Sequence, residues 1–124
     1  AARQLDRSRR RLTARLPAHL EVSALIRATG QAGGFASVLH KGEPEGGTIL
    51  VLLTDRGENP RVYERMPSLD GDRKWTLSKS QDPDNKREID EYLERRGAQD
   101  RDLWIIELDI ADGERLIGLT DAAS

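Results

Sequence analysis

A short apolar run between two turn-forming segments constrains this fold more than any other feature of the sequence. The segment Thr48–Thr54 contains five consecutive aliphatic residues, with glycines before it and an Asp-Arg-Gly turn after it. A run of this length, bounded by turn residues, predicts a strand that is buried on both faces. Leu50 and Leu52 then point to one face, and the other three aliphatic residues point to the opposite face. The rest of the chain must therefore cover this strand from both sides.

Length and composition set the class of protein. With 124 residues and no cysteine, the chain is long enough to form one hydrophobic core without disulfides. No apolar stretch approaches the roughly 20 residues of a membrane-spanning helix, and the first residues lack the apolar core of a signal peptide. We therefore expect a cytoplasmic protein with a flexible, arginine-rich segment at residues 1–16 and a single α+β domain at residues 17–124.

The charge is distributed unevenly along the chain. Residues 1–16 contain six arginines and one acidic residue, a net charge of +5, whereas the rest of the chain carries −7. The acidic body disfavours nucleic-acid binding by the domain itself, while the basic segment can contact phosphates or an acidic partner. No aromatic residue alternates with these arginines, which favours a solvated terminus. The candidate basic tail consists of Arg7, Arg9, Arg10, Arg11 and Arg15.

Two helices are predicted from apolar periodicity and capping signals. After a short extended piece at His19–Val22, Ser23 is a suitable N-cap for a helix that ends near Gln31, where a glycine-rich turn follows. Asp82 is a suitable N-cap for a second helix, and Gly97 is its expected C-cap.

Alternating and apolar segments predict five strands and a short sixth one. Because the loops between the first four strands are short, we expect antiparallel neighbours in a meander. Asp70-Gly71 and Asp112-Gly113 are typical of tight hairpin turns. The predicted class is α+β: an antiparallel sheet of about five or six strands, a meander plus a C-terminal hairpin, with two helices. The expected strands are Phe35–Lys41, Thr48–Thr54, Arg61–Met66, Lys74–Lys79, Leu103–Ile110 and Glu114–Leu119.

Six short segments resemble, in their order and amino-acid sequence, segments of one family of bacterial proteins. They are Val22–Arg27, Gly33–Ala36, Lys41–Pro44, Tyr63–Arg65, Glu88–Leu93 and Asp102–Glu107. On these segments the chain resembles, from Pro17 to Leu119, the family catalogued as domain of unknown function 1491, which is found mainly in alphaproteobacteria. The resemblance implies a cytoplasmic protein of about this size without an established activity. It supplies no catalytic or binding residues that can be carried over to positions in this chain.

No motif in the sequence identifies a reaction centre. The glycines from Gly30 to Gly34 close a helix and open a strand, which is the reverse of a phosphate-binding loop. The two histidines, His19 and His40, show no spacing typical of a metal site. The chain has no cysteine nucleophile and no Gly-x-Ser-x-Gly elbow. We therefore assign no catalytic, cofactor-binding or metal-binding residue and expect no cofactor.

Two polar clusters are weaker candidates for binding. Tyr63 and Trp75 fall on neighbouring predicted strands and, if exposed, form a stacking platform for RNA. Core packing is favoured for Trp75, because the chain has few large aromatic residues. The candidate binding face consists of Tyr63, Arg65, Arg73 and Trp75. The acidic side of the second helix, with Asp90, Glu91 and Glu94, is interrupted by basic residues and is typical of a solvated face rather than of a cation site.

The leading functional hypothesis is a non-catalytic interaction domain that self-associates, for instance as a homodimer, or binds a protein partner. If both helices cover the same face of the sheet, Leu50 and Leu52 are left for a second copy or a partner, in a contact that salt does not weaken. One alternative is a nucleic-acid or ribosome-associated accessory protein that uses the basic tail. Another is an enzyme of unrecognised type, which requires a concave pocket with a titratable group of shifted pKa.

Overall fold

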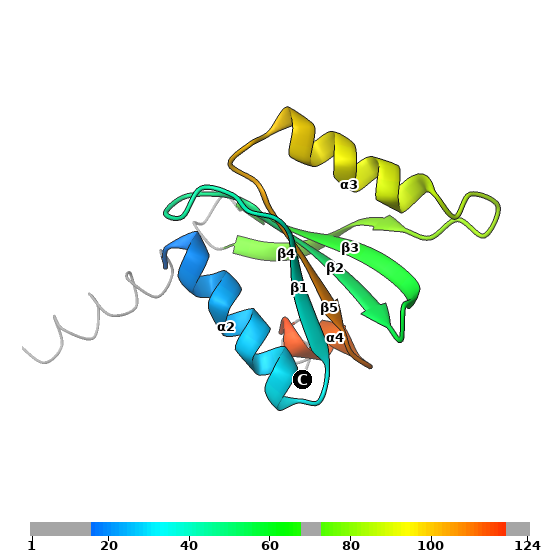
Figure 1. Cartoon of the computed structure of the whole chain (residues 1–124), viewed down its shortest axis with the longest axis horizontal. Coiled ribbons are helices and arrows are strands. Elements are labelled where there is room, and N and C mark those ends of the chain that lie inside the picture. The colour runs from blue at the N-terminus through cyan, green and yellow to red at the C-terminus, as the bar shows by residue number, and fades with distance from the viewer. Residues whose placement is uncertain (1–15, 68–72, 119–124) are drawn as a thin grey trace, which may run out of the picture.

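The fold is organised around strand β2 (Ile49–Asp55), which is the third of five strands in one sheet. The computed structural model describes residues 16–67 and 73–118 of the chain. Figure 1 shows the sheet between helices that lie on its two sides. In chain order the elements are α2 (Ala18–Gln31), β1 (Phe35–His40), β2 (Ile49–Asp55), β3 (Glu58–Pro67), β4 (Arg73–Ser80), α3 (Glu88–Gln99), β5 (Trp104–Asp109) and α4 (Gly113–Leu116).

The strand order is β1-β5-β2-β3-β4, so the last strand of the chain lies between the first two. β5 runs parallel to β2 and antiparallel to β1, and the pairs β2–β3 and β3–β4 are antiparallel. The α+β class and a mainly antiparallel sheet of five strands are therefore confirmed. The meander, however, covers only β2, β3 and β4. The chain then crosses through α3 from β4 to β5, which run in the same direction although they are not neighbours in the sheet.

The burial of β2 on both faces is confirmed. Five of its seven residues are aliphatic, and each of these five is at most 6% exposed. On one side, the α2 face, Val51 and Leu53 pack with residues of β5, α2 and the segment that follows α4. On the other side, the α3 face, Leu50 and Leu52 pack under Ile89 and Leu93 of α3.

The helices α2 and α3 therefore cover opposite faces of the sheet (Figure 1). The hypothesis of two helices on one face, with Leu50 and Leu52 left bare, is wrong, because α3 shields both leucines from solvent. Leu50 and Leu52 are therefore not available as a contact surface.

Helix α2 begins five residues before the expected N-cap at Ser23. No side chain caps it. Instead, the backbone N–H groups of Ala18 and His19 donate to the carbonyl oxygens of Glu45 and Pro44, at 3.0 and 2.9 Å. A loop distant in sequence thus satisfies the free N–H groups of the first turn, which local capping rules do not anticipate.

Helix α3 begins and ends later than the capping signals predict. It starts at Glu88, and Asp82 instead accepts a hydrogen bond from the backbone N–H of Asp84, in a turn before the helix. Gly97 lies inside the last turns, not at the C-cap. A Cβ at this position would come within 3.0 Å of the His40 ring, so glycine allows the helix to approach β1 closely.

The end of the described chain forms a helix where an edge strand was expected. Asp112 has a left-handed backbone conformation, with φ of 56°, and α4 follows it directly at Gly113. The Asp112-Gly113 pair therefore starts a helical turn and no hairpin, which raises the number of described helices to three. The Asp70-Gly71 signal lies outside the described residues, although β3 and β4 pair antiparallel on both sides of it, as far as Pro67 and Arg73.

We expect Gly42→Ala to lower the free energy of unfolding by about 1–3 kcal/mol, because a Cβ there would overlap the backbone of Asp102 and Leu103. Gly30→Ala is the matched control: it adds the same methyl group to α2 with no atom within 4 Å. It should stabilise the protein by up to about 1 kcal/mol through helix propensity. Urea unfolding of the three proteins measures both changes, and equal stabilities would contradict this packing of the β1–β2 loop.

Candidate functional site

The edge strand β1 carries three exposed large apolar residues, Phe35, Val38 and Leu39. Of all large apolar side chains in the described residues, Phe35 is the most exposed, at 78%, and Leu39 and Val38 are 50% and 45% exposed. β1 pairs with β5 on one side only, so the backbone N–H and C=O groups along its other edge face outward. This combination of open backbone groups and apolar side chains is a template for another strand.

The two edges of the sheet differ in charge. The six residues of β1, Phe35–His40, include no lysine, arginine, aspartate or glutamate. The opposite edge strand, β4, contains Arg73, Lys74 and Lys79, and charges of this kind are a common device against edge-to-edge pairing. Charged residues therefore protect β4 against pairing with another strand, and β1 lacks this protection.

A bulge divides β1 into two parts. Val38 lies opposite Ile106 on the α2 face, and the register shifts before His40, which lies opposite Ile105 on the α3 face. The Nδ1 atom of His40 is 2.5 Å from the carbonyl oxygen of Leu103, a contact that requires the proton on this nitrogen. Leu39 is the additional residue, and its side chain lines two hollows on the α3 face.

The larger hollow, of about 680 Å³, lies between α3 and the turn that joins β2 to β3. At its base the Oγ1 atom of Thr54 donates to the carboxylate of Glu107 at 3.0 Å. Glu58 and Asp90 add two carboxylates to the lining, and Lys86 adds one ammonium group. The smaller hollow, of about 360 Å³, lies between β1 and the second half of α3 and is mainly apolar.

The described residues provide no metal centre. Within residues 16–67 and 73–118, no three His, Cys, Asp or Glu side chains are grouped to hold a metal ion. The groups whose pKa is shifted, Arg61, Tyr63, Arg96 and Glu114, line neither of the two hollows beside α3.

The candidate binding face of Tyr63, Arg65, Arg73 and Trp75 lies on β3 and β4. The Trp75 and Tyr63 rings are partly buried against the core of the α2 face. Arg65 lies opposite Trp75, with its guanidinium carbon 4.9 Å from the ring centre, and it also pairs with Glu21 of α2. The Arg73 side chain and the basic tail from Arg7 to Arg15 lie outside what the structure describes, so a role in binding remains a proposal for them.

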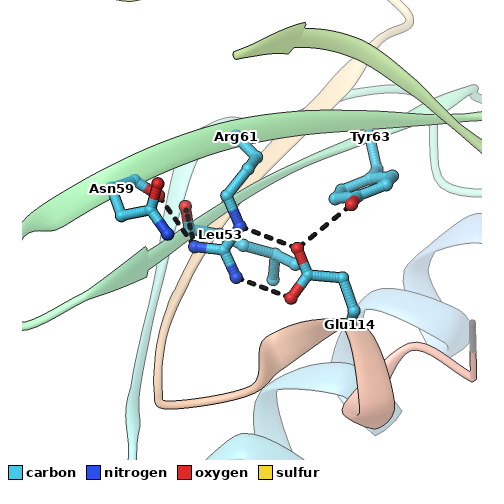
Figure 2. A network of polar contacts seen from close by, with 5 residues as sticks. All are labelled: Leu53, Asn59, Arg61, Tyr63 and Glu114. Carbon is cyan, nitrogen blue, oxygen red and sulfur yellow. Dashed lines mark hydrogen bonds and ion pairs between the residues drawn. The ribbon is translucent and has the colours of Figure 1, made fainter. Parts of the chain in front are cut away.

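Glu114 connects α4 to Arg61 and Tyr63 of β3. Its carboxylate accepts hydrogen bonds from Arg61 at 2.6 and 2.7 Å and from the Tyr63 hydroxyl at 3.0 Å (Figure 2). The hydrogen bonds from Arg61 lower the pKa of Glu114 to about 2, against the opposing effect of burial. Burial, followed by the hydrogen bond to Glu114, raises the pKa of Tyr63. These bonds hold α4 on the sheet and occupy the polar atoms of Arg61 and Tyr63.

The fold and this open edge together define a small α+β domain with an unprotected strand. The model of a family described as a protein of unknown function, DUF1491, matches residues 16–118. This chain therefore belongs to the DUF1491 family, as the segments discussed above indicated.

Solved structures of relatives share the fold. The crystal structure of a DUF1491 family protein from Caulobacter crescentus CB15 is 32% identical, with a TM-score of 0.73, and the match covers 83% of this chain and 95% of that one. An NMR structure of a DUF1491 family protein from the same organism gives 31% identity and a TM-score of 0.71, over 82% and 92% of the two chains. The solution structure of protein Atu0922 from A. tumefaciens gives 31% identity and a TM-score of 0.67, with the same coverage.

No curated protein matches this chain. In the described part of the chain, no helix is both long enough and apolar enough to cross a membrane.

Sequence reasoning did not single out Phe35, Val38 and Leu39. Their alternation with small residues predicts a strand but does not say which strand lies at an edge. The sequence contains one relevant signal. Phe35–His40 has no charged residue, although 34% of the residues in the chain are charged.

We expect Glu114→Gln to reduce stability in a pH-dependent way. The pKa of Glu114 is lowered in the folded state, so its contribution is fully present above the unfolded value of 4.5 and is lost as the pH falls from there to about 2. Near neutral pH the variant should lose about 1 kcal/mol of unfolding free energy, because solvent partly screens the pair. Unfolding curves between pH 2 and 7 should therefore converge at the acid end. Glu91→Gln, an exposed carboxylate on α3, should give a small and constant difference.

Proposed function

We propose that this protein is a non-catalytic interaction domain and that the free edge of β1 is its contact surface. The observation that carries the proposal is the exposure of Phe35, Val38 and Leu39 on an uncharged edge strand. Strand addition at such an edge uses backbone hydrogen bonds for affinity and side chains for specificity. A cytoplasmic location belongs to the same proposal.

A second copy of this chain is the partner that best fits the β1 edge. Most homo-oligomers are two-fold symmetric, and two β1 strands in antiparallel arrangement would join two sheets into one. No like charges meet in this arrangement, because Phe35–His40 is uncharged. Each of the three apolar side chains, if fully buried in the contact, would stabilise it by about 1.5–3 kcal/mol.

The hydrophobic character of the edge favours this proposal over the two alternatives. A nucleic-acid role depends on the arginines of residues 1–15, which the structure does not describe. An enzymatic role needs a titratable group of shifted pKa in a pocket, and Glu114, which accepts hydrogen bonds from Arg61 and Tyr63, lies outside the two hollows.

We expect the wild-type protein to associate in sedimentation equilibrium and Val38→Lys to weaken association at least tenfold. Val38 lies near the middle of β1, so two lysines at this position come close to a two-fold axis and repel each other. Raising the salt concentration from about 0.1 to 0.5 M should change the wild-type dissociation constant little, since the contact is made by apolar groups and backbone.

Leu77→Lys is the matched control. Leu77 is 51% exposed, lies on the α2 face like Val38, and belongs to the opposite edge strand β4. It should associate as the wild type does. A monomeric wild type at about 100 µM, or equal weakening by both lysines, would contradict the β1 edge as the contact surface.

A further inference from the structure

The two hollows on the α3 face both lie between β1 and α3. Leu39 lines both of them, and the apolar floor of the smaller hollow is made by Leu93, Ala98 and Ile105. Together their linings extend from Lys86, two residues before α3, to Ala98 near its end. We call this surface the α3 groove. It has room for aliphatic side chains at one end and polar groups at the other.

Carboxylates dominate the charge of the α3 groove. Asp90 and Glu94 lie one helical turn apart on α3, and Glu107 lies at the base, while Lys86 is the one cation among the lining residues. In the described part of the chain, the ion pairs of α3 use Glu88 and Arg96, and none involves these three carboxylates. The groove therefore fits an occupant with an aliphatic side chain flanked by positive charges.

Residues 1–15 of this chain have that composition. Leu12 follows three consecutive arginines, Arg9–Arg11, and precedes Arg15 by three residues. The segment to residue 16 carries +5 in a chain whose remainder carries −7. Arginine is suited to this role because its planar guanidinium pairs with carboxylates in a bidentate manner.

The segment joins the described structure at Leu16, at the end of the sheet where α3 also ends (Figure 1). The N–H of Ala18 is bonded to Glu45 of the β1–β2 loop, and the N–H of Glu43 in the same loop is bonded to Asp102, three residues beyond the end of α3. The start of α2 and the segment after α3 are therefore both bonded to the β1–β2 loop, at the same end of the sheet but on opposite sides of it (Figure 1). From Leu12 to Ala18 the chain spans six residues, which reach about 20 Å when extended, about the length of a twelve-residue helix such as α3.

We propose that residues 1–15 bind in the α3 groove of their own chain, with Leu12 over the apolar floor and the neighbouring arginines paired with Asp90 and Glu94. The segment would then lie beside the β1 edge. This proposal does not require self-association.

A spin label can locate the segment, because the chain has no cysteine and Ser8→Cys creates a single labelling position. We expect the nitroxide on the full-length chain to broaden the NMR amide signals of Leu39, Glu94 and Ala98 selectively. The amide signals of β4, on the far edge of the sheet, should stay sharp. The selective broadening should decrease at least twofold when the salt concentration is raised to about 0.5 M.

Matched charge variants test the carboxylates. Asp90→Asn with Glu94→Gln should abolish the selective broadening at the groove. Asp84→Asn with Glu91→Gln removes the same charge from exposed positions that line neither hollow, and it should leave the broadening unchanged. Broadening that is spread evenly, centred on another surface, or retained in the groove variant would overturn the proposal.

Mixed samples decide whether the segment belongs to the same chain. In a mixture, made in the Val38→Lys background, of isotope-labelled chains without nitroxide and unlabelled chains with it, the proposal predicts no selective broadening. Broadening in this mixture would overturn docking within one chain and assign the segment to a second copy. The Val38→Lys background separates this result from the proposed function, because it removes strand pairing at β1 and leaves the α3 groove intact.

Discussion

The fold depends on the burial of one strand from both sides. β2 has almost no exposed surface, so each of its faces needs a cover that leaves no gap, and the helices α2 and α3 provide these covers. Protein interiors are packed as densely as organic crystals, which means that neither helix can shift without opening a cavity over the central leucines. The domain therefore has three layers, with the five-stranded sheet in the middle and β2 at the centre of the sheet.

Charged side chains then fix how each helix sits on its face. Lys79 and Glu88 hold one end of α3, and Arg96 with Glu64 holds the other. Glu21 ties α2 to Arg65, and Glu114 ties α4 to Arg61. All four pairs join a helix to β3 or β4, where the apolar contacts end. They therefore fix the orientation of each helix at the side of the sheet where core packing holds it least. The edge strand β1 is excluded from these pairs, and its outer side is left for contacts with other segments.

Local patterns predicted the strands well and the helix boundaries poorly. A strand of alternating or apolar residues between glycines has few alternatives, which is why β1 to β5 lie close to their expected positions. The start of α2 depends on carbonyl groups from the loop at Pro44 and Glu45, and α4 depends on a left-handed Asp112 and on Glu114 binding Arg61. The partner residues Pro44, Glu45 and Arg61 lie far from these helices in the sequence, so local patterns do not indicate the contacts.

The sequence by itself determined that Thr48–Thr54 is a central strand and that the chain is an α+β domain, because the number and order of apolar residues follow from local periodicity. Only the tertiary structure decided that α3 lies opposite α2 and that β5 enters between β1 and β2. This insertion places Phe35, Val38 and Leu39 at an open edge. The physical reason is that alternation specifies which side chains share a face, whereas the identity of a strand's neighbours is set by pairing between residues far apart in the chain.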